Sequence, residues 1–209
     1  MNHDQATLLD FLSLTDYRYR YAPETLERLN GLVQDKGRTL DVGCGDGTIG
    51  LALDGAPVIG FDRSLSDLRS AQQRGLPVVV ADASRGIPFA TDAFDTVYCV
   101  DVLHHLEADW EPLFAELDRV LKPGGRLVIV EPDARSDFAQ VSQPPELEPQ
   151  LARRGYRYDS RAIHVEAEQA VRAVFPLWNR VFKAPFAIAL ATIYQDRPDK
   201  FALIGRKPE

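Results

Sequence analysis

The 209-residue sequence has few cysteines, no long apolar run and no signal-peptide pattern, which are features of disulfide-stabilised, membrane-spanning and secreted proteins. Its two cysteines, Cys44 and Cys99, are too few for a disulfide framework and suit a reducing compartment. The longest apolar run, at 184–192, is far shorter than the ~20 residues of a membrane helix. The first residues lack the basic and apolar pattern of a signal peptide. We therefore expect a cytoplasmic protein without a membrane span.

Positive charge is also in short supply. The sequence has 24 Lys and Arg against 31 Asp and Glu, a formal net charge of −7. Proteins that bind nucleic acids usually present a net basic surface, so we do not expect a nucleic-acid partner. The hydrophobic fraction of 45% and the charged fraction of 26% are typical of a globular protein. At this length we expect one domain with a sizeable core.

Short apolar segments alternate with amphipathic ones along the middle of the chain. The strand candidates are 38–42, 57–61, 77–81, 96–100 and 126–130. A helix is expected to begin at Ser64, with Asp67 placed as in a capping box, and a second helix is expected to end at the turn Lys122–Gly125. This alternation predicts an α/β fold with a parallel sheet covered on both faces. Ligands of such sheets bind at the carboxyl ends of the strands.

The most informative segment is the glycine turn that follows the first strand, TLDVGCGDGT at 39–48. Alternate glycines allow the backbone to turn sharply and to approach a ligand with no Cβ in the way. The helix that follows directs its unpaired N–H groups at whatever occupies the turn. A glycine-rich turn alone is weak evidence, but its place between a strand and a helix favours a ligand site.

Acidic residues at the ends of the next two strands add to this interpretation. Asp62 ends the second strand, where a carboxylate can accept both hydroxyl hydrogens of a ribose. Asp82 ends the third strand and can accept from the exocyclic amine of a base. Either residue alone would be explained as a helix cap or a solvated strand end. Together with Asp41 beside the glycine turn, they favour a nucleoside site.

A series of motifs in uninterrupted order carries a resemblance to a known family. Segment 40–47 resembles motif I of the class I S-adenosylmethionine-dependent methyltransferases, and 61–64 resembles motif II. Segments 81–83, 87–89 and 94–97 are similar to the third and fourth motifs, and 103–106 and 121–127 complete the series. The resemblance covers about 38–132, and it is greatest to the small-molecule branch typified by the ubiquinone/menaquinone biosynthesis C-methyltransferases.

The resemblance implies a Rossmann-like sheet of seven strands, mostly parallel, with helices on both faces and the last strand antiparallel. It implies S-adenosyl-L-methionine as the cofactor and O- or C-directed methyl transfer to a small-molecule acceptor. On this basis we expect a single domain over 1–209. It divides into a helical cap at 1–37, a cofactor-binding core at 38–132, a variable substrate loop at 133–160, and a helix at 161–175 followed by strands at 186–194 and 201–205.

The resemblance also assigns the glycine turn to the methionine and ribose portions of the cofactor. Gly43, Gly45 and Gly47 would lie beneath these portions, with Cys44 in the same turn. Asp41 would orient the amino-acid moiety, often through water.

The remaining cofactor contacts implied by the family fall on the next three strand ends. Asp62 would take the ribose hydroxyls, with Arg63 beside the adenine. Asp82 would receive the adenine amino group, with the N–H of Ala83 close by. Val100 would flank the sulfonium.

Catalysis at a sulfonium methyl group mainly requires alignment of the acceptor, with a general base where the acceptor is acidic. His104 and His105 follow the fourth strand; His104 is the candidate base, and both histidines can instead shape the pocket through hydrogen bonds. Asp101 can orient an acceptor or cap the loop. Tyr21 would close over the cofactor. No metal is expected, because Asp101 has no supporting Asp-Asn pair.

The acceptor is the least constrained part of this interpretation. The aromatic and basic runs at 17–21 and 153–161 suit an anionic or aromatic acceptor, or else form a solvated face with tyrosines packed on the sheet. An NAD-binding domain is disfavoured, because the glycine turn departs from the G-x-G-x-x-G pattern of such domains.

Two other functions stay as alternatives to small-molecule methylation. The first is a regulatory or non-methylating protein that binds the cofactor. The second, RNA or protein methylation, is less favoured, because the chain is acidic and small.

Overall fold

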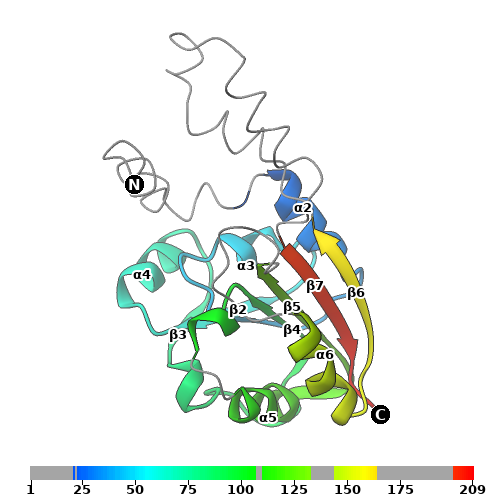
Figure 1. Cartoon of the computed structure of the whole chain (residues 1–209). Helices are drawn as coiled ribbons and strands as arrows, with labels where there is room; N and C mark the ends of the chain where they lie inside the picture. The colour runs from blue at the N-terminus through cyan, green and yellow to red at the C-terminus, as the bar shows by residue number, and fades with distance from the viewer. Residues whose placement is uncertain (1–20, 22, 107–109, 133–143, 164–199) are drawn as a thin grey trace, which may run out of the picture.

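A computed structural model describes residues 21, 23–106, 110–132, 144–163 and 200–209. Its centre is a seven-stranded sheet with the order β3-β2-β1-β4-β5-β7-β6 (Figure 1). β1 to β5 run parallel, whereas β7 is antiparallel to both of its neighbours, β5 and β6. This is the predicted Rossmann-like sheet, with its last strand antiparallel. The strands are β1 (Thr39–Val42), β2 (Val58–Asp62), β3 (Val78–Val80), β4 (Phe94–Val100), β5 (Leu121–Pro132), β6 (Arg157–Ile163) and β7 (Lys200–Arg206).

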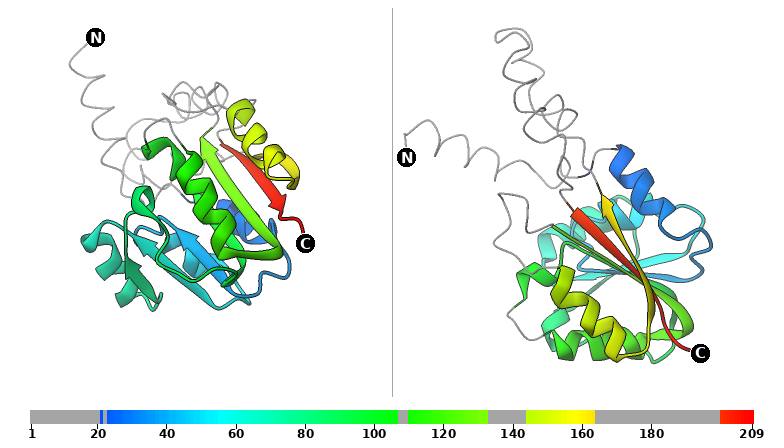
Figure 2. Two further views of the ribbon diagram at one scale, coloured as in Figure 1. Left: turned by 90° about the horizontal axis from the view of Figure 1, so that it is seen from below. Right: turned by 45° about the vertical axis from the view of Figure 1, so that its right-hand side comes forward.

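Helices cover the two faces of this sheet (Figure 2). The α-helices are α2 (Pro23–Gly31), α3 (Thr48–Ala52), α4 (Leu65–Gln73), α5 (Glu111–Val120) and α6 (Pro144–Arg153). α5 and α6 share one core cluster with the sheet, to which they contribute Leu117 and Leu147, both fully buried. α2 and α3 share a second cluster, with Leu29 and Ile49. The central strands are therefore apolar on both faces, as a covered parallel sheet requires.

Local sequence signals explain where several elements begin and end. The Ser64 hydroxyl accepts a hydrogen bond from Asp67 N at 3.4 Å and caps α4, as predicted. The Lys122–Gly125 turn lies inside β5 and not between α5 and the strand. The β4–β5 register jumps there, from Phe94 opposite Leu121 to Thr96 opposite Arg126. Gly124, with a φ of 70°, accommodates the bulge because glycine tolerates this conformation.

Two predictions about the second half of the chain are wrong. Segment 133–160 was expected to be a loop, but it contains α6 and the beginning of β6. A helix was expected from residue 161, but β6 continues to Ile163 and pairs with β7. β7, Lys200–Arg206, is longer than the last predicted strand by one residue at each end. The strand expected at 186–194, residues 164–175 of the expected helix and residues 1–20 of the expected cap lie outside the described residues, and the division of 1–209 into functional segments stays a prediction.

Candidate functional site

The glycine turn joins the carboxyl end of β1 to α3. Gly43, Gly45 and Gly47 have φ values of 66°, 51° and 82°. Glycine adopts a positive φ without strain, whereas other residues rarely do. The backbone of the turn therefore requires glycine at these three positions. Space is limited as well, since a Cβ on Gly43 would lie 2.7 Å from Val102 Cγ2. The turn thus places backbone without side chains directly against the loop that follows β4.

Arg74, at the end of α4, holds this turn from outside. Its Nη1 donates to the backbone carbonyl of Asp46 at 3.0 Å and to Asp46 Oδ2 at 3.0 Å. The same nitrogen lies 2.9 Å from Thr48 Oγ1, which in turn donates to Asp46 Oδ1 at 2.7 Å. The Asp46 corner is therefore fixed to two helices through side-chain hydrogen bonds.

Asp62 ends β2 directly beside the glycine turn. Its Oδ2 accepts from Gly45 N at 3.0 Å, and its Oδ1 accepts from Ser64 N at 2.8 Å. Two backbone N–H groups thus orient the carboxylate. Because each carboxylate oxygen can accept more than one hydrogen bond, both keep capacity for a ligand.

Asp82 follows β3 and caps a short 3₁₀ helix, η2 (Ala83–Arg85). Its Oδ1 accepts from Ser84 N at 3.0 Å and from Ser84 Oγ at 2.7 Å. These hydrogen bonds lower the pKa of the Asp82 carboxyl, so the group is ionised near neutral pH. Its other oxygen, Oδ2, lies 3.8 Å from Arg85 Nε.

These groups surround a cavity of about 230 Å³ at the carboxyl ends of the parallel strands. Six of the residues that the sequence assigned to the cofactor line it: Gly43, Gly45, Asp62, Arg63, Asp82 and Ala83. Eight residues that were not assigned to the cofactor also line it: Phe61, Ser64, Asp67, Ala81, Asp101, Val102, His105 and Leu106. Four of these eight residues, Phe61, Ser64, Ala81 and Asp101, are direct sequence neighbours of residues assigned to the cofactor, so adjacency was the signal for them.

The other assigned residues, Tyr21, Asp41, Cys44, Gly47, Val100 and His104, are not part of this cavity wall. Asp41 lies beneath the turn, 1% exposed, and its Oδ2 has no hydrogen-bond partner among the described residues. Burial, and to a lesser degree the charge of Asp62, raises the pKa of Asp41 to about 7. Cys44 is also buried, and its Sγ packs against Gly60, where a Cβ would lie only 2.6 Å away.

A buried ion pair borders the cavity beyond β4. Asp101 has a φ of 55°, an uncommon conformation for a residue other than glycine, and it is 4% exposed. Its carboxylate pairs with Lys200 and accepts from the hydroxyl of Tyr21. Burial would raise the pKa of Asp101, but the charge and hydrogen bonds of Lys200 and the hydrogen bond from Tyr21 outweigh it and hold the pKa below its usual value. The beginning of β7, the end of β4 and the chain before α2 meet here.

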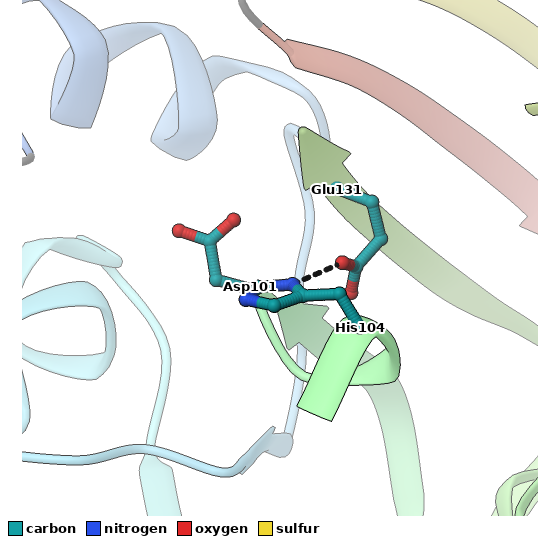
Figure 3. Close-up of side chains that lie close together, drawn as sticks. All are labelled: Asp101, His104 and Glu131. Atoms are coloured by element: carbon teal, nitrogen blue, oxygen red, sulfur yellow. Dashed lines mark hydrogen bonds and ion pairs between the residues drawn. The ribbon is translucent and has the colours of Figure 1, made fainter. Parts of the chain in front are cut away.

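His104 stands between Asp101 and Glu131 in Figure 3. Its Nδ1 lies 2.7 Å from Glu131 Oε2. The other oxygen of the fully buried Glu131 accepts from Val102 N at 2.9 Å and from Leu103 N at 2.8 Å. Glu131, near the end of β5, therefore fixes both the loop after β4 and the His104 ring. The ring of His105, which lines the cavity, lies 3.9 Å from the His104 ring, centroid to centroid.

Asp101, His104 and Glu131 each offer a possible metal-ligand atom, and these atoms lie within 4.8 Å of one another. These possible ligand atoms, however, already form hydrogen bonds or ion pairs within the chain. Lys200 and Tyr21 hold Asp101, whereas backbone N–H groups and His104 hold Glu131. We therefore interpret the trio as a hydrogen-bonded support for the loop, and the absence of a metal stays a prediction.

The basic and aromatic run at 153–161 does not reach the cavity. Arg154 pairs with Glu111 and lies over the Phe114 ring on α5, 5.2 Å from the ring centroid. The Tyr156 hydroxyl donates to Asp118 Oδ1 at 2.6 Å. These contacts attach β6 and α6 to α5, so they agree with the packing alternative for this run. Residues 17–20 of the other run lie outside the described residues.

The fold and the site define an α/β protein with a ligand cavity at the carboxyl ends of its parallel strands. Residues 40–129 match a family model described as a methyltransferase domain. A demethylmenaquinone methyltransferase of Corynebacterium urealyticum is 38% identical over 107 residues, which are 51% of this chain and 46% of that protein. The chain spans about half or less of the length of the curated relatives it matches.

Solved structures share the fold at low sequence identity. An S-adenosylmethionine-dependent methyltransferase from Archaeoglobus fulgidus is 20% identical, with a TM-score of 0.68, over 92% of this chain and 100% of that one. The [4+2]-cyclase SpnF is 23% identical, with a TM-score of 0.59, over 89% of this chain and 80% of that one. Residues 40–129 are therefore similar to a methyltransferase domain, and demethylmenaquinone methyltransferases are among the relatives of this part of the chain. Among the described residues, no helix is long and apolar enough to cross a membrane.

Proposed function

We propose that this protein transfers the methyl group of S-adenosyl-L-methionine to a small-molecule acceptor. The observation that carries the proposal is the cavity itself. It joins the glycine backbone of the turn after β1 with the carboxylates of Asp62 and Asp82 at the ends of β2 and β3. Bare backbone admits a closely fitting ligand, whereas the carboxylates suit a ribose diol and an amine.

The residues present fit this cofactor in three further respects. A Cβ on Gly43 would fill the cradle and meet Val102. Asp41 keeps a buried carboxylate oxygen without a hydrogen-bond partner among the described residues, and this oxygen can serve an ammonium group directly or through water. A cationic ligand also suits the cavity electrostatically, because Asp62, Asp67 and Asp82 line it against a single arginine, Arg63.

We assign the roles from the family resemblance, both for the residues of the cavity wall and for Tyr21, Asp41, Cys44, Gly47 and Val100, which lie outside that wall. Gly43, Gly45 and Gly47 shape the floor for the methionine and ribose portions, with Cys44 as packing. Asp41 serves the amino-acid moiety and Asp62 the ribose hydroxyls.

The adenine and sulfonium ends take the remaining assigned residues. Arg63, Asp82 and the N–H of Ala83 surround the adenine. Val100 and Tyr21 close the sulfonium end, where Tyr21 is fixed by its hydrogen bond to Asp101.

The bound cofactor supplies an electrophilic methyl group, so the protein has to hold the acceptor in line and exclude water. His104 is our candidate general base. When its Nδ1–H donates to Glu131, its Nε2 is left as the proton acceptor. The adjoining His105 forms part of the cavity wall and shapes the approach. Because the run at 153–161 lies elsewhere, it gives no support to an anionic or aromatic acceptor.

Isothermal titration calorimetry of the full chain with S-adenosylmethionine tests the cofactor part of the proposal. We expect saturable binding that Asp62→Ala weakens about 100-fold, since the change removes charge-assisted hydrogen bonds. Asp54→Ala, at an exposed carboxylate outside the cavity, is the matched control and should bind normally. Unchanged affinity in Asp62→Ala would sink the assignment.

A cofactor-binding protein that does not transfer methyl groups is the second candidate. The observation in its favour is that SpnF, a [4+2]-cyclase by its description, has the same fold. Incubation with methyl-labelled cofactor and a panel of quinols, phenols and carboxylic acids separates the two candidates. Label transfer to one acceptor class supports the enzyme. Tight cofactor binding without transfer to any class favours the second candidate.

A further inference from the structure

The border of the sheet at β6 is exposed along nearly its whole length. The strand order ends with β7-β6, so β6 is paired on one side only within the described part of the chain. Of its seven residues, Arg157–Ile163, only Ile163 is buried. Figures 1 and 2 show β6 at the edge of the sheet, next to β7. An unpaired row of backbone N–H and C=O groups is a template for another strand.

β6 carries three charged residues, Arg157, Asp159 and Arg161, but it lacks the other features by which edge strands commonly avoid such pairing. Its sequence, RYDSRAI, contains no proline and no lysine. Its pairing with β7 runs through seven consecutive residue pairs without a register shift, so no bulge interrupts it. Tyr158 adds a large side chain that is 38% exposed. The strand is therefore regular, long enough to pair, and open.

We propose that β6 pairs antiparallel with β6 of a second copy of this chain, about a two-fold axis through Ser160. In this register all seven residues overlap. Within one strand Arg161 Nε already pairs with Asp159 Oδ2 at 2.8 Å. In the dimer Asp159 of each copy also lies opposite Arg161 of the partner subunit, so the four charges form a network with two cross-strand pairs of opposite charge. Such directly opposed pairs stabilise an antiparallel ladder.

The charges select this register over its neighbours. An axis through Asp159 would set that residue opposite its own copy and Arg157 opposite Arg161. An axis through Arg161 would oppose that residue to itself. Like charges directly opposite each other are unfavourable. The inference does not rest on the proposed methyl transfer, since no residue of β6 lines the cavity.

Charge-swap variants of the full chain test the pairing by sedimentation velocity over a range of concentrations. We expect a concentration-dependent dimer. Asp159→Arg alone or Arg161→Asp alone should weaken dimerisation about tenfold or more, because each turns two attractive pairs into repulsive ones. The double swap should restore it. A monomer at every concentration, single swaps without effect, or a double swap that fails to recover the dimer would each overturn the proposal.

A cysteine at the axis tests the register. Two copies of Ser160→Cys would face each other within the Cα separation that a disulfide requires, so mild oxidation should link them. Ala162→Cys is the matched control on the same strand, because its copies would lie four residues out of register. The native Cys44 and Cys99 are buried and should not react. Equal cross-linking of both variants, or of neither, would contradict the Ser160 axis.

Discussion

Two groups of strand ends meet at the same edge of the sheet but use their charges differently. The ligand-facing end, made by Asp62, Asp82 and the glycine turn after β1 to β3, presents carboxylates to a cavity. The charge-paired end consists of Asp101 directly after β4, Glu131 near the end of β5 and Lys200 at the beginning of β7, and it satisfies its charges within the chain. The ligand-facing end is arranged to bind, whereas the charge-paired end is arranged to hold a loop in place.

Burial therefore distinguishes acidic residues at equivalent positions of one sheet. The more exposed carboxylates are placed to bind a ligand, and the buried ones hold a loop in place. Asp82 is about a third exposed at its side chain, but Asp101 is 2% exposed there. A buried carboxylate needs internal partners, because desolvation is costly without them. We therefore expect substitutions at the charge-paired end to lower mainly the free energy of unfolding. Substitutions at the ligand-facing end should lower mainly the affinity for the cofactor.

The largest effect is expected for Glu131→Ala. The change leaves Val102 N and Leu103 N buried without their acceptor and releases His104. We expect a loss of about 5 kcal/mol in the free energy of unfolding, measured by urea denaturation. Glu131→Gln retains one acceptor oxygen and should lose about 2 kcal/mol. Equal stability of the two variants would mean that the backbone contacts contribute little.

Lys200→Met should follow, since it leaves Asp101 buried without its cation. We expect a loss of about 4 kcal/mol near neutral pH. The lowered pKa of Asp101 determines how the free energy of unfolding changes with pH. The stabilising contribution of the Asp101 carboxylate is present above the pKa of the unfolded state and is lost as pH falls through the pKa of the folded state. In Lys200→Met this acid-sensitive contribution should shrink. Adding Asp101→Asn should recover part of the loss; a strictly additive double variant would argue against direct pairing.

Asp41→Asn tests the boundary between the two behaviours, because Asp41 is buried yet belongs to the ligand-facing end. The folded pKa of about 7 lies well above the ordinary value of 3.8, so the native state favours the protonated form and stability declines as pH rises from about 4 to 7. At pH 8 we expect the variant to be more stable than the native protein by about 3 kcal/mol, but to bind the cofactor more weakly. Urea denaturation at several pH values and calorimetry measure the two effects; parallel pH profiles would contradict this account.

Gly60→Ala should have the smallest effect, about 2 kcal/mol of destabilisation, because its Cβ would lie 2.6 Å from Cys44 Sγ. The strain belongs to the support of the glycine turn. Because this Cβ would also lie 2.7 Å from Cys44 Cβ, Cys44→Gly, which removes both atoms, should rescue the stability of Gly60→Ala. Thermal denaturation of the two single variants and the double variant measures this, and a double variant no more stable than Gly60→Ala would show that the clash lies elsewhere.

The parallel core was predictable because its signals are local. Each of the five parallel strands carries its own apolar run, and each glycine of the turn has a positive φ. α6 was missed because Pro144, Pro145 and Pro149 suggested a loop. Proline is tolerated in the first turn of a helix, and the burial of Leu147 and Leu151, four residues apart, offsets the cost of Pro149.

β6 and the charge-paired end could not be found in the same way. Nearly every residue of β6 is exposed, so the strand has no apolar alternation, and its conformation depends on pairing with β7. Tyr21, Asp101 and Lys200 are brought together from positions 80 and 99 residues apart. No pattern within a short window records such a contact. Most of the cavity residues, in contrast, lie within the motifs that predicted the site; Asp67, Asp101 and Val102 are the exceptions.

The position of β7 in the sheet has a consequence for synthesis. β7 is the last described strand to leave the ribosome, yet it stands between β5 and β6. Until it emerges, β6 has no neighbour within the described chain, and Asp101 lacks its lysine. The pairing edge of β5 therefore stays unpaired among the described strands until β7 has been made, so β5, β6 and β7 complete the sheet together at the end of synthesis.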